Sequence, residues 1–247
     1  MKFVGVDLGW QSQPSGFCLL TLQGDRLTLD TLTRYEHHGE ILATIGAIAG
    51  PALIAVDAPT LIPNATGMRL PDRLAHRHFG KYQAGAYPAN QSLPFAARTV
   101  AFGQALESQG FAHAPALIPQ QPGRYQIEVF PHPATITLFG LPRILRYKKG
   151  RLADRAAELT RYRTYLQTVL PTLVPPCSLP ELPPIPATGA ALKNLEDRLD
   201  SLLCAYIGAH WWYWGTARNL VLGDREQGYI VVPAPSGSKL FGPAQPS

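Results

Sequence analysis

Phe3-Val4-Gly5-Val6-Asp7 is a short apolar run that ends on a carboxylate. A continuous apolar run of this length predicts a buried strand. A carboxylate at the tip of such a strand is costly to bury unless a partner or a cation compensates its charge. The same pattern returns in Leu53-Ile54-Ala55-Val56-Asp57, and Glu128 stands inside a third apolar run, from Tyr125 to Phe130. If these strand tips converge on one point, we expect them to form a site for a hard cation.

The segments between these runs predict how the strands are connected. Residues 16–22 and 26–34 have the composition of two strands, and Gln23-Gly24-Asp25 between them is a hairpin turn signal. A helical pattern from Ile41 to Ile48 ends at Gly50-Pro51, before the strand that carries Asp57. The predicted order of strand, hairpin, helix and strand is the order in which a ribonuclease H-like sheet begins. We therefore predict an α/β fold whose mixed sheet has three antiparallel strands followed by parallel strands, flanked by helices.

The rest of the chain shows no convincing domain boundary. Seven prolines between Pro171 and Pro186 favour a stiff, extended connector. We predict a single ribonuclease H-like domain over residues 1–233, with residues 171–189 as a connector inside it and residues 234–247 as a flexible tail. Further elements are predicted at residues 70–80, 95–109, 133–139, 154–169 and 190–214, which are helical, and at residues 220–233, which form a hairpin.

The helix over residues 190–214 carries two carboxylates three positions apart. Positions i and i+3 lie on one face of a helix, so Asp197 and Asp200 are expected to point toward one target. Asp200 lies nearer the apolar stripe of this helix and is predicted to face the strand tips, with Asp197 or Glu196 at the rim. Singly, Asp7 and Asp57 are also ordinary turn residues after a strand. Their recurrence with Glu128 and Asp200 is what indicates a shared site.

Composition and charge narrow the class of protein. The chain has 247 residues, of which 46% are hydrophobic and 16% charged, as in a globular protein. Its net charge of +5 permits contact with phosphate-rich partners without requiring it. Three scattered cysteines without C-x-x-C spacing indicate a reducing compartment and argue against zinc. No secretory leader and no apolar run of ~20 residues is present, so we predict a cytoplasmic protein without a membrane partner.

Two basic clusters are candidates for binding a phosphate backbone. Arg69, Arg73 and Arg77 recur at four-residue steps along one predicted helix face, and Lys148-Lys149 lies in a second cluster. For the first cluster, a solvated helix face or an internal ion-pair network of Arg69 with Asp72-Arg73 is nearly as good an interpretation. For the second, the alternative is an ordinary basic loop.

These motifs together resemble domain-of-unknown-function family 429, whose members are predicted ribonuclease H-like nucleases. The resemblance implies the same fold and a nuclease activity for this chain. Phe130 and the displaced His132 depart from the family pattern, as does Leu8-Gly9-Trp10 after the first motif. The matching pieces run in the expected order through almost the whole chain: Gly5-Val6-Asp7, Asp57-x-Pro59, Arg69-x-x-Asp72-Arg73 with Arg77, Glu128-Val129-x-Pro131, Lys148-Lys149, Asp197-x-x-Asp200 and Gly223-Asp224…Gly228-x-Ile230…Pro233.

A carboxylate site of this kind selects Mg²⁺ or Mn²⁺. Two such ions roughly 4 Å apart activate water and stabilise the leaving oxygen of a phosphodiester. We expect Asp7 to bridge the metals, Glu128 or Asp57 to hold one, Asp200 to hold the other, and Asp197 to serve as an alternate ligand. The predicted function is therefore metal-dependent hydrolysis of DNA or RNA.

Two other classes of protein fit parts of the sequence. Sugar kinases and actin-like ATPases also begin with a strand that ends in aspartate, as in Gly5-Val6-Asp7-Leu8-Gly9, but they need two duplicated halves and this chain is too short for them. A non-catalytic nucleic-acid or nucleotide-binding protein that kept the fold is the remaining alternative. The sequence leaves open whether the protein forms a homodimer.

Overall fold

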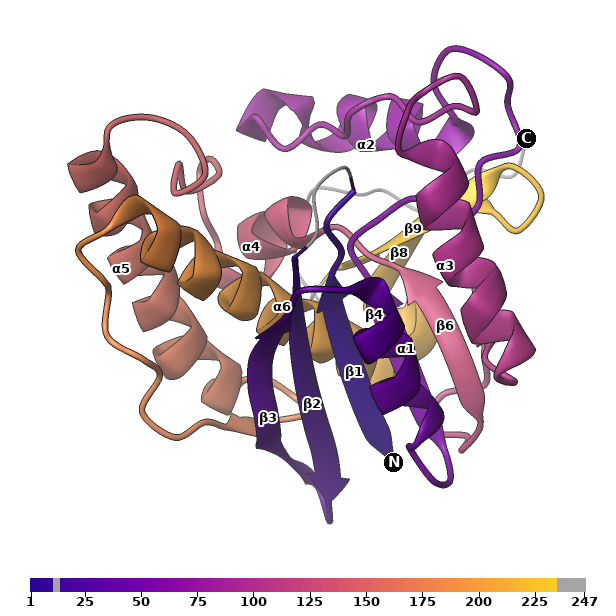
Figure 1. Cartoon of the computed structure of the whole chain (residues 1–247). Helices are drawn as coiled ribbons and strands as arrows, with labels where there is room; N and C mark the ends of the chain where they lie inside the picture. Colours follow the sequence, from indigo (N-terminus) through magenta and orange to yellow (C-terminus); the bar gives the residue numbers. More distant parts are fainter. Residues whose placement is uncertain (11–13, 235–247) are drawn as a thin grey trace.

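A seven-stranded mixed sheet forms the centre of the computed structural model, which describes residues 1–10 and 14–234 (Figure 1). Its strand order is β5-β6-β4-β1-β2-β3-β7, and β8 and β9 form a separate antiparallel pair. The predicted tail lies outside the described residues from position 235 on. The strands are β1 (Lys2–Asp7), β2 (Ser15–Gln23), β3 (Arg26–Tyr35), β4 (Ala52–Val56), β5 (Ala112–His113), β6 (Arg124–Glu128), β7 (Cys177–Ser178), β8 (Asn219–Asp224) and β9 (Gly228–Pro233).

The strand pairing follows the predicted connections in its central part. Strands β1, β2 and β3 pair antiparallel, while β4 pairs parallel with β1 and β6 parallel with β4. The predicted α/β fold with a mixed sheet is confirmed. Its strand order is less simple than expected, because two-residue strands extend both edges: β5 beside β6, and β7 parallel with β3. Strand β7 lies inside the proline-rich segment. It forms there because the backbone groups at the edge of β3 would otherwise be unpaired.

Helices cover both faces of the sheet. Successive side chains of each strand point alternately into two cores, one on each face of the sheet, as expected for a side-chain period of two. Phe3, Leu53 and Ala55 face the core that includes α6, whereas Val4 and Val56 face the core under α1 and α3. Among the described residues, no helix is both long and apolar enough to cross a membrane. The helices are α1 (His38–Gly46), α2 (Leu70–Phe79), α3 (Ala96–Ser108), α4 (Pro131–Phe139), α5 (Leu152–Val169) and α6 (Gly189–Trp214).

Helix α6 lies in backbone contact with the first two strands. A Cβ atom on Gly5 would stand 1.9 Å from the carbonyl oxygen of Ser201, and one on Gly16 would stand 1.9 Å from that of Asp197. Only glycine permits this approach. At its far end the helix is anchored by Trp211, which is fully buried and whose indole Nε1 donates to the carbonyl of Ala114 at 3.0 Å. The contact places the acid-bearing turn of α6 beside the ends of β1 and β2.

The hairpin of β8 and β9 packs against α2 and against β6. An isolated parallel bridge joins Val129, just after β6, to Val231 in β9. Helix α2 begins after Arg69, whose backbone N–H donates to the carboxylate of Asp72 at 3.0 Å and so closes a capping contact. These elements therefore lie next to the carboxyl ends of β4 and β6.

Candidate active site

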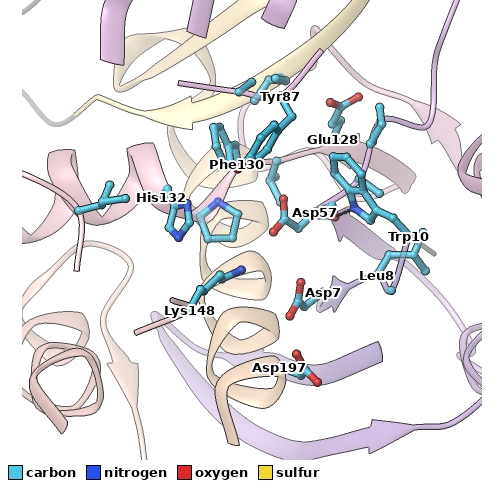
Figure 2. A pocket seen from close by; sticks show the side chains of 18 of the residues that line it. Asp7, Leu8, Trp10, Asp57, Tyr87, Glu128, Phe130, His132, Lys148 and Asp197 are labelled. Atoms are coloured by element: carbon cyan, nitrogen blue, oxygen red, sulfur yellow. Dashed lines mark hydrogen bonds between the residues drawn. The ribbon is translucent and has the colours of Figure 1, made fainter. Parts of the chain in front are cut away.

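A cavity of about 920 Å³ lies at the carboxyl ends of β1, β4 and β6. Ends of parallel strands meet at one edge of a sheet, which is where ligand sites of open α/β sheets lie. Figure 2 shows the carboxylates of Asp7 and Asp57 close to the amine of Lys148, with Asp197 below them and Glu128 farther away. The sequence-predicted acids thus come to one region, but they do not share one environment.

Asp7 and Asp57 form the open centre of the cavity. Both lie on the face of the sheet that packs against α6, because alternate strand residues point to the same face. The residues of that face are Phe3 and Gly5 before Asp7, and Leu53 and Ala55 before Asp57. No hydrogen bond or ion pair joins either carboxylate to another residue that the structure describes. Two oxygen-rich groups without partners, side by side, are the donor set that a hard cation prefers.

Asp200 lies beneath this centre and does not line the cavity. Its side chain is fully buried and accepts a hydrogen bond from the Tyr147 hydroxyl at 2.8 Å. The Lys148 Nζ lies 2.8 Å from the other carboxylate oxygen in an ion pair. Asp200, which we predicted as a metal ligand, therefore contacts Lys148, whose amine points toward Asp7 and Asp57 (Figure 2).

Glu128, which we predicted as a metal ligand, is paired with an arginine in this structure. Both of its oxygens accept from the Arg69 guanidinium, at 2.6 and 2.8 Å. Arg69 also pairs with Asp72 at 2.8 Å and donates to the carbonyl of Leu61, and all three charged side chains are buried. This is the internal ion-pair network that the sequence left as an alternative, and Arg69 also lines the cavity.

The reason lies in the side-chain alternation of β6. Ile127 and Val129 belong to the core on the α6 side, so Glu128 between them faces the other side of the sheet. It pairs in register with Val56 and not with Asp57. Successive side chains of a strand point to opposite faces of the sheet. The apolar neighbours Ile127 and Val129 are therefore the signal in the sequence that places Glu128 on the opposite face from Asp57.

Asp197 lines the cavity, and its charge is already compensated. Arg34 Nε lies 3.1 Å from one of its oxygens and Lys193 Nζ lies 2.7 Å from the other. Lys193 also pairs with Glu196 at 2.8 Å. Asp197 is almost fully buried, and the cations paired with it give this part of the cavity a mixed charge.

The other predicted substrate-binding residues divide into two groups. Lys148 and Lys149 both line the cavity, and Lys149 Nζ donates to the Tyr87 hydroxyl at 3.1 Å. Arg73 and Arg77 are exposed on α2 and do not line it. The basic cluster on α2 is therefore split between the buried Arg69 and two solvated arginines.

The charges around Lys148 do not balance. Asp7, Asp57 and Asp200 carry three negative charges when ionised, against one positive charge on Lys148, which leaves two in excess. Burial raises the pKa of Asp7 well above its usual range and that of Asp57 to about 7, although Lys148 opposes both shifts. Burial alone would lower the pKa of Lys148, but Asp200, Asp7 and Asp57 raise it well above its usual value. Lys148 is thus a fixed ammonium that neutralises only part of the site.

This arrangement partly fits a divalent metal ion. No group of three or more His, Cys, Asp or Glu side chains in the described part of the chain is arranged to hold one. The two unpaired carboxylates and their excess charge suit one Mg²⁺ or Mn²⁺, with water and substrate oxygens as its other ligands. Asp7 and Asp57 are therefore the residues that would hold it, in place of the larger set predicted from the sequence.

From the sequence, Trp10 and Phe130 were noted only as departures from the family pattern, and Tyr87 was not noted. Trp10, Tyr87 and Phe130 line the cavity beside the carboxylates (Figure 2). Trp10 Nε1 donates to the backbone carbonyl of Asp57 at 3.0 Å, so the ring is fixed to the same strand end as the acid. Single aromatic residues in loops carry no periodic pattern, and Tyr147-Lys148 in a basic loop gave no sign of the buried contacts with Asp200.

The model of a family described as a protein of unknown function (DUF429) matches residues 5–227. A search among curated proteins finds no match. Among solved structures, that of RuvC from Thermus thermophilus is similar to this chain with a TM-score of 0.35 and 12% sequence identity, and the alignment covers 85% of this chain and 98% of that one. The family match extends over all the acidic residues that line the cavity, from Asp7 to Asp197.

Proposed function

The chain belongs to the DUF429 family of proteins of unknown function, and from the chemistry of its cavity we propose that it is a metal-dependent hydrolase of phosphodiester bonds in DNA or RNA. One observation carries the proposal: Asp7 and Asp57 lie unpaired at two adjacent strand ends, beside an ammonium that neutralises only part of their charge. A cation and a phosphate together complete such a site, because the cation offsets the carboxylates and Lys148 offsets the phosphate.

The fold that we propose is ribonuclease H-like, in a single domain over residues 1–233. Its support is the central pairing, in which an antiparallel β1-β2-β3 meander is followed by parallel β4 and β6. Asp7 ends β1 and Asp57 directly follows β4, so both acids lie at the same edge of the sheet. All residues that the proposal uses lie on one chain, so it needs no second copy.

We propose one resident Mg²⁺ or Mn²⁺ in place of the two ions expected from the sequence. When Asp7, Asp57 and Asp200 are all ionised, the excess of two negative charges around Lys148 matches one divalent cation. When bound, the cation lowers the pKa of a water molecule and stabilises charge on the phosphate oxygens. Asp7 and Asp57 would hold the cation, and Asp57 would also lie near the attacking water.

In the proposed reaction, a water oxygen forms a bond to phosphorus while the bond from phosphorus to the leaving oxygen breaks. The carboxylate of Asp57 accepts the proton of that water. The Lys148 ammonium donates a proton to the leaving oxygen, and exchange with solvent restores both groups. Asp200 and Tyr147 act as positioning residues for Lys148.

Cleavage of labelled nucleic acid tests the proposal. We expect single-stranded DNA or RNA of about twenty nucleotides to be cut in Mg²⁺ or Mn²⁺ and to stay intact in EDTA. Asp7→Asn removes a proposed ligand and is expected to abolish cleavage. Asp25→Asn is the matched control, because Asp25 is exposed in the turn between β2 and β3. Cleavage that persists in Asp7→Asn contradicts the proposal, and binding without cleavage by the wild type favours a non-catalytic binding protein.

A further inference from the structure

Aromatic side chains line one part of the cavity, which we call its aromatic half. Tyr87 and Phe130 lie near one another above Asp57, and Trp10 stands on the opposite side (Figure 2). Proteins place flat aromatic rings at such positions to stack on flat ligands, and every nucleobase has a face suited to this contact. The hydrolytic centre described above uses none of these rings.

The rings of Trp10 and Phe130 are held near the ends of β4 and β6, the strands that lead to Asp57 and Glu128. Trp10 is fixed by its hydrogen bond to the Asp57 carbonyl and packs behind on Phe95, with ring centroids 4.7 Å apart. Phe130 is separated from the end of β6 by Val129 alone and precedes Pro131, the first residue of α4. The distance from the aromatic half to the carboxylates is therefore set by the sheet.

Two rim segments, residues 80–89 and 141–150, meet beside the cavity. Three hydrogen bonds join them: the Ile144 amide to the Tyr82 carbonyl at 3.1 Å, the Arg146 guanidinium to the Gln83 side chain at 3.0 Å, and Lys149 to the Tyr87 hydroxyl at 3.1 Å. Both segments contribute residues to the cavity lining. A volume of about 920 Å³ between such segments suits one small ligand unit.

Resting on the proposed function, we propose that the cavity takes one unstacked nucleotide unit, with its base against Tyr87 and Phe130 and its phosphate beside Lys148, Asp7 and Asp57. The unit is a free nucleotide or the end of a single strand. A paired base cannot use the aromatic half without leaving its stack, since its two faces are already covered. The aromatic half thus selects for an unpaired base, while the carboxylate half acts on the phosphate.

Calorimetry with adenosine 5′-monophosphate and ribose 5-phosphate in Mn²⁺ tests this directly. The two ligands share the sugar and phosphate and differ in the base. We expect the nucleotide to bind at least about tenfold more tightly, which is the order that one stacked base contributes. Equal affinity for the two ligands, or no binding of either, overturns the proposal.

Variants then locate the base. Tyr87 is 70% exposed, so Tyr87→Ala removes a ring without disturbing a core, and Phe130→Leu keeps an apolar side chain but removes the aromatic face. The two changes combined are expected to abolish the preference for the nucleotide. Tyr165→Ala is the control, because Tyr165 stacks on Phe139 at the α4–α5 contact and does not line the cavity. A preference that survives in the double variant overturns the placement of the base.

Oligonucleotides identify the source of the unit. Tighter binding of a single-stranded ten-nucleotide DNA than of the mononucleotide identifies a strand end, and the reverse identifies a free nucleotide. Either result supports the proposal, whereas equal affinity for single-stranded and blunt duplex DNA overturns it. A separate Mn²⁺ titration of wild type and Asp7→Asn distinguishes the two proposals. Mn²⁺ binding that requires Asp7, without base preference, refutes only the nucleotide site; base preference without Mn²⁺ binding refutes only the metal site.

Discussion

Replacing Asp57 by asparagine should stabilise the metal-free protein. Burial raises the pKa of this carboxyl from 3.8 to about 7, so its ionised form is disfavoured in the folded state. At 1.36 kcal/mol per pH unit, full ionisation costs the folded state about 4 kcal/mol. Because the carboxylate faces a cavity that water can enter, we expect roughly half of that cost, ~2 kcal/mol. Asparagine has nearly the same shape and no charge, so Asp57→Asn removes the cost.

The effect depends on pH in a defined direction. A carboxyl whose folded-state pKa is raised contributes stability that is present at low pH and is lost as pH rises through about 7. The advantage of Asp57→Asn over wild type should therefore be absent near pH 4 and complete near pH 8.5. Urea denaturation in EDTA at these two pH values measures it, with Asp25→Asn as the control for a surface carboxylate.

Adding Mn²⁺ should reverse the order of stability. A cation that binds only the folded state adds stability in proportion to its affinity, and wild type gains more than a variant that lacks one ligand. If Asp57→Asn is less stable than wild type in EDTA at pH 8.5, then Lys148 already compensates Asp57, and the excess of negative charge on which the metal proposal rests does not exist.

Further substitutions separate the roles of neighbouring residues. Lys148→Gln keeps a hydrogen-bond donor for Asp200 but removes the ammonium, so we expect several-fold tighter Mn²⁺ binding by calorimetry together with loss of cleavage; unchanged affinity contradicts the charge count. Glu128→Gln weakens the buried pair with Arg69 and should lower the free energy of urea unfolding by about 3 kcal/mol while leaving Mn²⁺ affinity as it is; a loss of affinity would return Glu128 to the ligand set. Burial lowers the pKa of His210 to about 4, so its contribution to stability is present above pH 6.5 and is lost as pH falls toward 4. His210→Gln should therefore flatten the decline of the melting temperature over that range, and an unchanged profile would show that His210 does not cause it.

The sequence predicted the parts of this structure that follow from the spacing of apolar residues and from turn residues such as glycine and proline. The apolar runs that end at Asp7 and Asp57, the hairpin at Gly24 and the long helix from residue 190 all have strong local signals. The segments that the structure adds, β5 and β7, are two residues long and depend on an edge of the sheet being near. No local pattern encodes that proximity.

The candidate site was predictable in location but not in its pairing. The strand tips and the acidic turn of α6 were expected to converge, and Asp7 and Asp57 do meet at the cavity. Which acid receives which cation depends on loops far away in sequence: Lys148 reaches Asp200, and Arg69 reaches Glu128. Only the alternation of side chains along β6 carried information about these pairings, because it places Glu128 on the other side of the sheet from Asp57.

The close approach at Gly5 and Gly16 has a consequence for how the protein fluctuates. Strand β1 and helix α6 carry Asp7 and Asp200, and their backbones touch with no side chain between them. Such an interface has no room for small sliding movements, so its amide hydrogens should exchange with deuterium only when the whole protein unfolds. The rim segments are joined by a few side-chain and loop hydrogen bonds, and their amides should exchange through local opening at much lower free energy. The carboxylates then act as a fixed template, and any adjustment to a ligand takes place in the rim.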